Sequence, residues 1–273
     1  MTELGIVDLR EINKIIYEQY GYDFSNFAIT SYKQRLEYII MHNNLSGKDE
    51  LIRKISGHPG FFDIFLHEIS VPSSEMFRDP SLWRWLREEV FATLSETNLM
   101  NFKIWFPYCV SGGELYSMAI LLKEMDLLNK VKIIASYMSE RSLELIRSGD
   151  YDLKKTEISA ENYRRFHGSR IFKDYYNIDR YYALRDTSLI NNVEFIKQNI
   201  NFDNAPYNVR LILFRNTAIY FNPNMQETVL SKLHNSLSVT GYLIVGSNER
   251  LRGANTGEFE FVNEAESVYK KKI

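Results

Sequence analysis

The chain has 273 residues, of which 45% are hydrophobic and 25% charged, a composition typical of a globular protein with one sizeable core or two smaller ones. Its formal net charge of −2 gives no electrostatic case for binding nucleic acid or a membrane surface. The single cysteine excludes an internal disulfide, and the five histidines are not spaced like the ligands of a metal ion. The sequence shows no signal peptide and no apolar run long enough to span a membrane. We therefore expect a cytoplasmic protein without membrane insertion or a bound metal.

Residues 1–68 are predicted to form an all-helical domain. Apolar side chains recur at helical spacing in residues 9–20 and again in residues 32–40. Residues 57–60, with the sequence Gly-His-Pro-Gly, predict a turn, and a short apolar helix is expected over residues 61–69.

Residues 69–80 are predicted to be a linker. The stretch contains Pro72 and two serines and ends in Asp79 and Pro80. Asp79 is expected to cap the next helix, and Pro80 to occupy its first position. Apolar residues between positions 82 and 90 then predict a buried helix face.

From residue 103 onward, strands are predicted to alternate with helices, which favours an α/β fold with a mainly parallel sheet covered on both faces. The expected strands cover residues 104–106, 132–135, 193–196, 211–214 and 242–246. Well-signalled helices cover residues 139–147, which end at Gly149, and the stretch after Asn222 and Pro223.

A small-residue turn follows the strand at residues 104–106. Ser111, Gly112 and Gly113 lead into a helix with apolar residues at helical spacing. A strand, a tight turn and a helix N-terminus together form a cradle typical of nucleotide sites. Two adjacent glycines also occur in ordinary strand–helix turns, so this segment alone is a weak indication.

Residues 151–192 break the alternation and are dense in aromatic and charged residues. We interpret them as a small inserted β-subdomain. A surface excursion whose aromatic side chains pack on the main sheet is an equally good interpretation of the same pattern.

Five ordered stretches resemble the CheR family of chemotaxis receptor methyltransferases. They are SEMFRDP at 74–80, the strand, loop and helix at 104–122, Asn199 after the third strand, LFRNTAIYF at 213–221 and GSNERL at 246–251. The resemblance implies a Rossmann-like class I methyltransferase sheet, with residues 81–273 forming the methyltransferase-like domain. It also implies that this sheet has seven strands, of which the last, near residues 267–271, runs antiparallel. It also implies methyl transfer from S-adenosylmethionine to a glutamate side chain of a chemoreceptor or other signalling protein.

The same resemblance assigns site residues. Arg78 and Tyr220 are expected beside the reacting groups. The cofactor is expected to contact Ser74, Arg78, Glu114, Asn199, Ile200, Arg215 and Asn216. Aligning a carboxylate nucleophile with an activated methyl donor requires positioning more than acid–base chemistry, which agrees with a sequence that shows no catalytic triad.

Several positions depart from the family pattern, among them Ser74 in place of Thr, Phe214 in place of Cys, and four positions at the expected cofactor site. Pro72 replaces Asn, Tyr108 replaces Gly, Gly113 replaces the first of two Glu, and Tyr137 replaces the Asp that ends the second strand. The lost Asp matters because it accepts hydrogen bonds from the ribose hydroxyls, and two tyrosine rings are expected to narrow the adenosine site. Three functions therefore stay open: a methyltransferase with altered cofactor contacts, a non-catalytic binding protein that no longer uses S-adenosylmethionine, and a protein that binds another small ligand.

Overall fold

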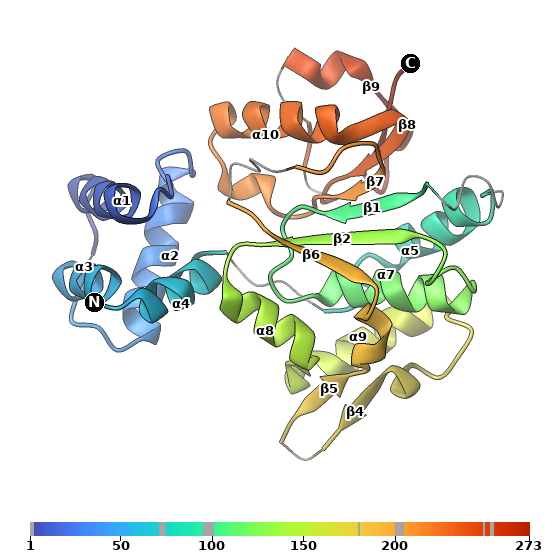
Figure 1. Ribbon diagram of the computed structural model, residues 1–273, viewed down its shortest axis with the longest axis horizontal. Coiled ribbons are helices and arrows are strands. Elements are labelled where there is room, and N and C mark those ends of the chain that lie inside the picture. Colours follow the sequence, from blue (N-terminus) through green and yellow to red (C-terminus); the bar gives the residue numbers. More distant parts are fainter. Residues whose placement is uncertain are drawn as a thin grey trace.

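The computed structural model describes residues 3–70, 75–94, 101–179, 181–199, 205–247, 249–251 and 254–273 (Figure 1). Its helices are α1 (Ile6–Tyr20), α2 (Ile29–His42), α3 (Lys48–Gly57), α4 (Pro59–Ile69), α5 (Pro80–Trp85), the π-helix η1 (Leu86–Phe91), α7 (Gly113–Glu124), α8 (Glu140–Ser148), α9 (Thr156–Phe166) and α10 (Pro223–Ser236). The short 3-10 helices are η2 (Leu153–Lys155), η3 (Phe172–Tyr175), η4 (Thr187–Ile190), η5 (Ala218–Tyr220) and η6 (Ala254–Glu258). The strands are β1 (Lys103–Phe106), β2 (Lys132–Tyr137), β3 (Asp150–Tyr151), β4 (Tyr176–Ile178), β5 (Ala183–Arg185), β6 (Val193–Lys197), β7 (Val209–Leu213), β8 (Leu237–Ile244), β9 (Phe259–Asn263) and β10 (Val268–Lys271).

The main sheet has seven strands in the order β6-β2-β1-β7-β8-β10-β9. The first five run parallel to one another, and β10 is antiparallel to both β8 and β9. The predicted mainly parallel sheet with an antiparallel last strand is therefore confirmed.

Alternating side chains on the strands pack against helices on opposite faces of the sheet. Ile104 and Phe106 lie in one hydrophobic cluster with α5, α7, α9 and part of α8. Trp105 points to the other face, where its cluster includes α10 (Figure 1). This alternation follows from the two-residue repeat of a strand, and both faces are buried as expected for a parallel sheet.

The predicted end of α8 at Gly149 and the predicted start of α10 after Asn222 are confirmed. α8 begins after Ser139, whose side chain accepts a hydrogen bond from the backbone N–H of Ser142, and it ends at Gly149, whose backbone is left-handed. α10 begins after Asn222, which caps it in the same way through the N–H of Met225.

Helices α1 to α4 stack beside the sheet and dock at its carboxyl edge (Figure 1). The Phe27 and Phe221 rings meet edge to face at 5.4 Å, and the Tyr220 carbonyl accepts a hydrogen bond from the N–H of Ala28. Asp63 on α4 accepts two more hydrogen bonds, from the first backbone N–H groups of α8. The buried side chains of these helices belong to the same hydrophobic cluster as α10 and the sheet face that it covers. The domain boundary at residue 68 is therefore a division of the sequence and not a gap in the hydrophobic core.

The segment 151–192 combines the two interpretations that its sequence allowed. With β3, it builds a three-stranded antiparallel sheet in the order β3-β5-β4. It also contains α9, a helix the sequence did not predict, which packs on α5. Tyr163, Phe166 and Phe172 are buried in the main core, whereas Tyr181 is 81% exposed.

Two local expectations were wrong, and one helix was not predicted. Residues 57–60 do not form a turn between helices: α3 runs to Gly57, and α4 already begins at Pro59. Helix α3 itself was not predicted. Asp79 precedes α5, but its side chain accepts no capping hydrogen bond because its carboxylate is paired with Arg215 instead.

Candidate functional site

A cavity of about 410 Å³ lies at the carboxyl edge of the sheet, where β1 and β7 end. These strands are neighbours, yet β1 leads to β2 on one side and β7 leads to β8 on the other. Such a reversal of strand order opens a crevice above the strand ends. The cavity is lined by Glu75 and Arg78 of the linker, the loop after β1, the segment after β7, Lys155 and Glu249.

The loop after β1 is held by a strand of the inserted segment. Gly112 has φ +75°, and a side chain there would lie 3.2 Å from Ile146, so glycine suits this turn. Arg185 on β5 is almost fully buried and donates hydrogen bonds to the Ser111 carbonyl at 2.9 Å and the Asp150 carbonyl at 2.7 Å. The shape of this loop therefore depends on the inserted segment.

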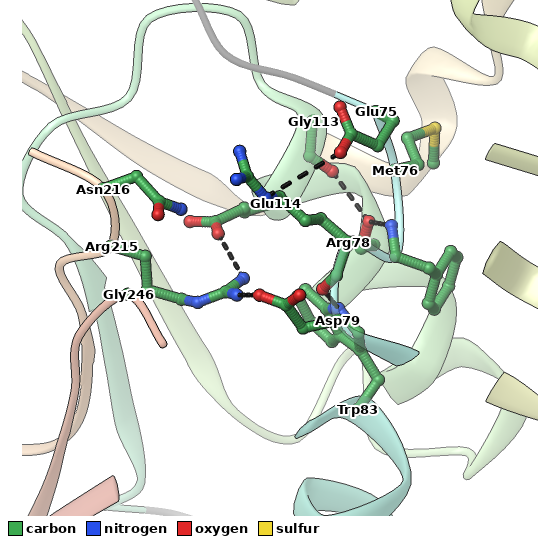
Figure 2. Close-up of polar contacts among 12 residues, drawn as sticks. Glu75, Met76, Arg78, Asp79, Trp83, Gly113, Glu114, Arg215, Asn216 and Gly246 are labelled. Atoms are coloured by element: carbon green, nitrogen blue, oxygen red, sulfur yellow. Dashed lines mark hydrogen bonds and ion pairs between the residues drawn. The ribbon is translucent and has the colours of Figure 1, made fainter. Parts of the chain in front are cut away.

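A buried guanidinium joins three of the motif stretches. Arg215 is 1% exposed in its side chain and donates to Glu114 at 2.6 Å and to Asp79 (Figure 2). Burial raises the pKa of Glu114 above its usual value, and the charge of Arg215 opposes that rise. Arg215 donates to Oε1 of Glu114, and Oε2 accepts no hydrogen bond within the described residues.

The linker is fixed through its backbone, which sets the position of Arg78. Phe77 donates its N–H to the Ser117 hydroxyl at 2.8 Å, and that hydroxyl donates to the Gly113 carbonyl (Figure 2). On the other side of Arg78, its carbonyl accepts a hydrogen bond from the Trp83 indole at 2.9 Å. Gly113, one of the departures from the family pattern, is the first residue of α7.

Two cationic side chains, Arg78 and Lys155, border the cavity, which the carboxylates of Glu75, Glu114 and Glu249 also line. Arg78 is 38% exposed and lies 3.8 Å from Glu75, a long ion pair. Lys155 lines the same cavity, and its ammonium makes no ion pair or hydrogen bond with any described residue. An anionic group entering the cavity would meet both cations.

The turn after β7 is braced by Glu249. Its carboxylate accepts hydrogen bonds from the N–H groups of Asn216 at 2.7 Å, Gly246 at 2.6 Å and Ile219 at 3.2 Å. Asn216 has a left-handed backbone, and its Oδ1 lies 2.6 Å from where a Cβ of Gly246 would be. This close packing fixes the strand end that leads to Tyr220.

A second, much smaller cavity of about 10 Å³ adjoins the first. It is lined by Tyr137 at the end of β2 and by Gln198 and Asn199 after β6. Tyr108 lines both cavities and thus lies in the wall between them. Burial raises the pKa of Tyr108 to about 12, although a hydrogen bond with Ser70 lowers it.

The residues present fit S-adenosylmethionine in polar character. The free Oε2 of Glu114 suits the ammonium of the methionine half. Buried amide atoms of Gln198 and Asn199 without hydrogen-bond partners suit the adenosine half. The smaller cavity has room for about one water molecule and is therefore too small for a nucleoside as it stands.

The structure brings most of the predicted site residues together. Arg78, Glu114, Arg215, Asn216, Tyr220, Tyr108 and Gly113 line the larger cavity, whereas Asn199 and Tyr137 line the smaller one. Pro72, Ser74 and Ile200 lie outside the described residues.

The polar residues that sequence reasoning missed at the two cavities include Glu75, Asp79, Lys155, Gln198 and Glu249. Three of them lie inside quoted stretches, Glu75 and Asp79 in SEMFRDP and Glu249 in GSNERL, so the motifs carried a signal for them. Gln198 stands next to Asn199 and could have been noticed for that reason. Nothing in the local sequence marks Lys155.

The described residues show neither a metal-binding cluster nor a membrane-spanning helix. They contain no group of three or more His, Cys, Asp or Glu side chains arranged to hold a metal ion. No helix among them has the length and apolar character needed to cross a membrane.

Comparison with known proteins gives consistent matches. Residues 72–268 match the family described as CheR methyltransferase, SAM binding domain. A Pseudomonas putida protein provisionally named as the methyltransferase Cher3 is 33% identical over 266 residues, 97% of each chain. Chemotaxis protein methyltransferase 1 of Vibrio cholerae is 28% identical, with 96% of each chain covered, and that of Borreliella burgdorferi is 25% identical, with 92% of this chain and 91% of the other covered.

Proposed function

The chain belongs to the CheR methyltransferase family, and from that premise we propose that it transfers a methyl group from S-adenosylmethionine to a glutamate side chain of a chemoreceptor or other signalling protein. The observation that carries this proposal is the buried Arg215, which ties Glu114 of the β1–α7 loop to Asp79 of the linker at the rim of a 410 Å³ cavity. The proposed location is the cytoplasm.

Each half of the cavity has a separate task in this reaction. When bound, S-adenosylmethionine supplies a methyl group activated by its positively charged sulfur. Glu114 would hold the ammonium of the methionine half through Oε2, and Arg215 keeps the Glu114 carboxylate in place. Asn216 and Glu249 fix the opposite wall.

The glutamate substrate is an anion, and its carboxylate is already a nucleophile at neutral pH. Arg78 and Lys155 would draw it into the cavity and hold it in line with the methyl group. Tyr220, which lines the same cavity, would orient it through its hydroxyl. No proton has to be removed from this nucleophile, so the proposed reaction needs no general base.

The direct test is incubation with S-adenosylmethionine labelled on its methyl group and cytoplasmic fragments of chemoreceptors from the source organism. The expected product is a base-labile methyl ester that releases labelled methanol. Arg78→Ala should lower kcat/KM by about a hundredfold, the order expected for losing one charged contact to the reacting group. Arg53→Ala, an exposed arginine on α3, is the matched control and should have no effect.

Two results together would overturn the proposal: no labelled ester with any receptor fragment, and no heat of binding with S-adenosylhomocysteine up to millimolar concentration. If the protein binds a receptor fragment but neither methylates it nor binds S-adenosylhomocysteine, a non-catalytic binding protein would be favoured instead.

A further inference from the structure

A buried arginine reaches from the inserted sheet to the loop after β1. Arg185, the last residue of β5, is only 3% exposed, and the inserted sheet lies on the side of the main sheet that α7 and α8 cover (Figure 1). Its Nη1 donates to the Ser111 carbonyl at 2.9 Å. Its Nη2 donates to the Asp150 carbonyl at 2.7 Å, and its Nε to the Gly149 carbonyl at 3.3 Å. Of these three bonds, the one to Ser111 ends on a loop that lines the larger cavity.

The charge of Arg185 has no carboxylate partner among the described residues. Its guanidinium lies instead over the rings of Tyr116 and Tyr151, at 4.2 and 5.1 Å from their centroids. Burying a charge is costly unless the group is fully hydrogen-bonded, and an uncharged side chain would allow β5 to pair with β3 without that cost. A planar group with five N–H donors can, however, hold carbonyls from two separate segments at once. Strand pairing alone therefore does not account for an arginine at this position.

Both segments approach the arginine closely. A Cβ on Gly112 would lie 3.4 Å from Nη1 of Arg185, and a Cβ on Gly149 would lie 2.6 Å from the Arg185 carbonyl. The Gly112 carbonyl also accepts a hydrogen bond from the N–H of Tyr116 at 2.9 Å. The arginine, the turn after β1 and the start of α7 therefore form one packed unit.

We propose that Arg185 is a positioning residue for the cofactor: it holds the loop after β1 in the shape that binds S-adenosylmethionine and so couples the order of the inserted sheet to the affinity of the larger cavity. This inference rests on the proposed function and adds to it a residue outside the family motifs. Arg185 acts through Ser111 and Gly112, which line the cavity. A loop that holds the binding shape for only a fraction of the time binds its ligand more weakly by that fraction. By linkage, cofactor binding and the order of the inserted sheet reinforce each other.

A purely structural role is the alternative, because two of the three side-chain bonds join β5 to the start of β3. In that case Arg185→Met would lower the stability of the protein and leave the affinity of the folded molecules unchanged. The variant keeps the length of the side chain and removes its charge and its donors. The two explanations therefore differ in what happens to ligand binding well below the Tm.

The first experiment measures the Kd for S-adenosylhomocysteine by titration calorimetry, together with kcat and KM for S-adenosylmethionine with a receptor fragment as acceptor. In Arg185→Met, Kd and KM should rise at least tenfold, whereas kcat should change less than threefold because a bound cofactor itself holds the loop at saturation. Arg87→Met is the matched control: Arg87 also lies over a ring, that of Phe166 at 4.9 Å, and donates to the His167 carbonyl at 3.0 Å. It should leave Kd and KM unchanged. A lower Tm of Arg185→Met with an unchanged Kd would overturn the inference.

The second experiment needs no cofactor. Cys109 is buried, lies two residues before Ser111 and lines the larger cavity, so its reaction with a thiol reagent reports opening of the loop. At pH 8, Arg185→Met should react at least tenfold faster than the natural protein, and Arg87→Met at close to the natural rate. Local opening depends little on denaturant, so adding about 1 M urea should hardly change the Arg185→Met rate. A rate that rises with urea as steeply as global unfolding does would contradict the hold on the loop.

The two experiments separate failure of this inference from failure of the proposed function. Equal binding of S-adenosylhomocysteine by the natural protein and Arg185→Met would overturn the positioning role and leave the proposed function intact. Faster thiol reaction of Arg185→Met, together with no binding of S-adenosylhomocysteine by the natural protein, would support the hold on the loop and count against the proposed function.

Discussion

Replacing Arg215 by methionine should destabilise the protein because it leaves two carboxylates without their partner. The Arg215 side chain is 1% exposed, that of Glu114 20% and that of Asp79 33%. Removing one member of a buried ion pair typically costs about 3 to 5 kcal/mol, and the partial exposure of the carboxylates reduces this to about 2 to 3 kcal/mol. For a protein of this size the corresponding fall in Tm is roughly 5 to 10 °C.

The loss should depend on pH in a defined direction. Burial already raises the pKa of Glu114 above its usual 4.5, and the variant removes the charge that opposes the rise. A carboxyl group with a raised pKa in the folded state binds its proton more tightly there. Its destabilising effect is therefore absent below the unfolded-state pKa and grows as pH rises through the folded-state pKa. The stability difference between Arg215→Met and the natural protein should be smaller near pH 4.5 than at pH 7.

Urea unfolding at the two pH values measures this difference, with Arg53→Met as an exposed control. Combining Arg215→Met with Glu114→Gln completes a double-mutant cycle, and the double variant should be more stable than the sum of the two single effects predicts. Unchanged stability of Arg215→Met at pH 7, or a loss that is the same at both pH values, would refute the assignment of Arg215 as the charge partner of these carboxylates.

Three further outcomes are expected. Asp63→Ala should lower the free energy of unfolding by about 1 kcal/mol, because Asp63 accepts hydrogen bonds at 2.8 Å from two N–H groups at the start of α8. The control variant Asp49→Ala, at an exposed position, should leave the stability unchanged, and equal losses in both variants would argue against the Asp63 contact. Burial and the charge of Arg141 lower the pKa of His67, so the folded protein should lose stability as pH falls below about 6.5 and this side chain has to take up a proton. Between pH 7.5 and 5.5, the urea midpoint of His67→Gln should therefore change less than that of the natural protein, and an equal change in both would contradict this. Cys109 is buried, and burial raises the pKa of its thiol to about 12. At pH 8 the folded protein should therefore react with a thiol reagent far more slowly than the protein unfolded in guanidinium does. Equal rates would show that the thiol is accessible in the folded protein.

The sequence was sufficient for the elements whose signals are local. Apolar runs bounded by stop signals identified β1, β2, β6 and β7, and the end of α8 and the start of α10 were predicted from Gly149 and Asn222. The order of short motifs identified the family and most residues of the larger cavity. These features follow from residue type and spacing alone, which do not depend on distant parts of the chain.

Tertiary structure decided what depends on residues far apart in the sequence. Asp79 looked like a helix cap, but Arg215, 136 residues later, takes its carboxylate as a charge partner. The shape of the β1–α7 loop depends on Arg185, which lies 74 residues beyond Ser111. Helix α9 was missed because tertiary packing on α5 stabilises a segment that its sequence left ambiguous.

The smaller cavity shows the same division most clearly. The sequence marked Tyr108 and Tyr137 as departures, but only the folded chain shows that Tyr108 separates two cavities and that Gln198 faces one of them with its amide unpaired. Pairing and burial of a polar atom are properties of the whole fold, because the groups that could satisfy it come from separate strands. Residue types therefore identified the family and the region of the site. Which side chains can bind a ligand depends on the tertiary structure, because β1, β2 and β6 are neighbours in the sheet and end at the same edge.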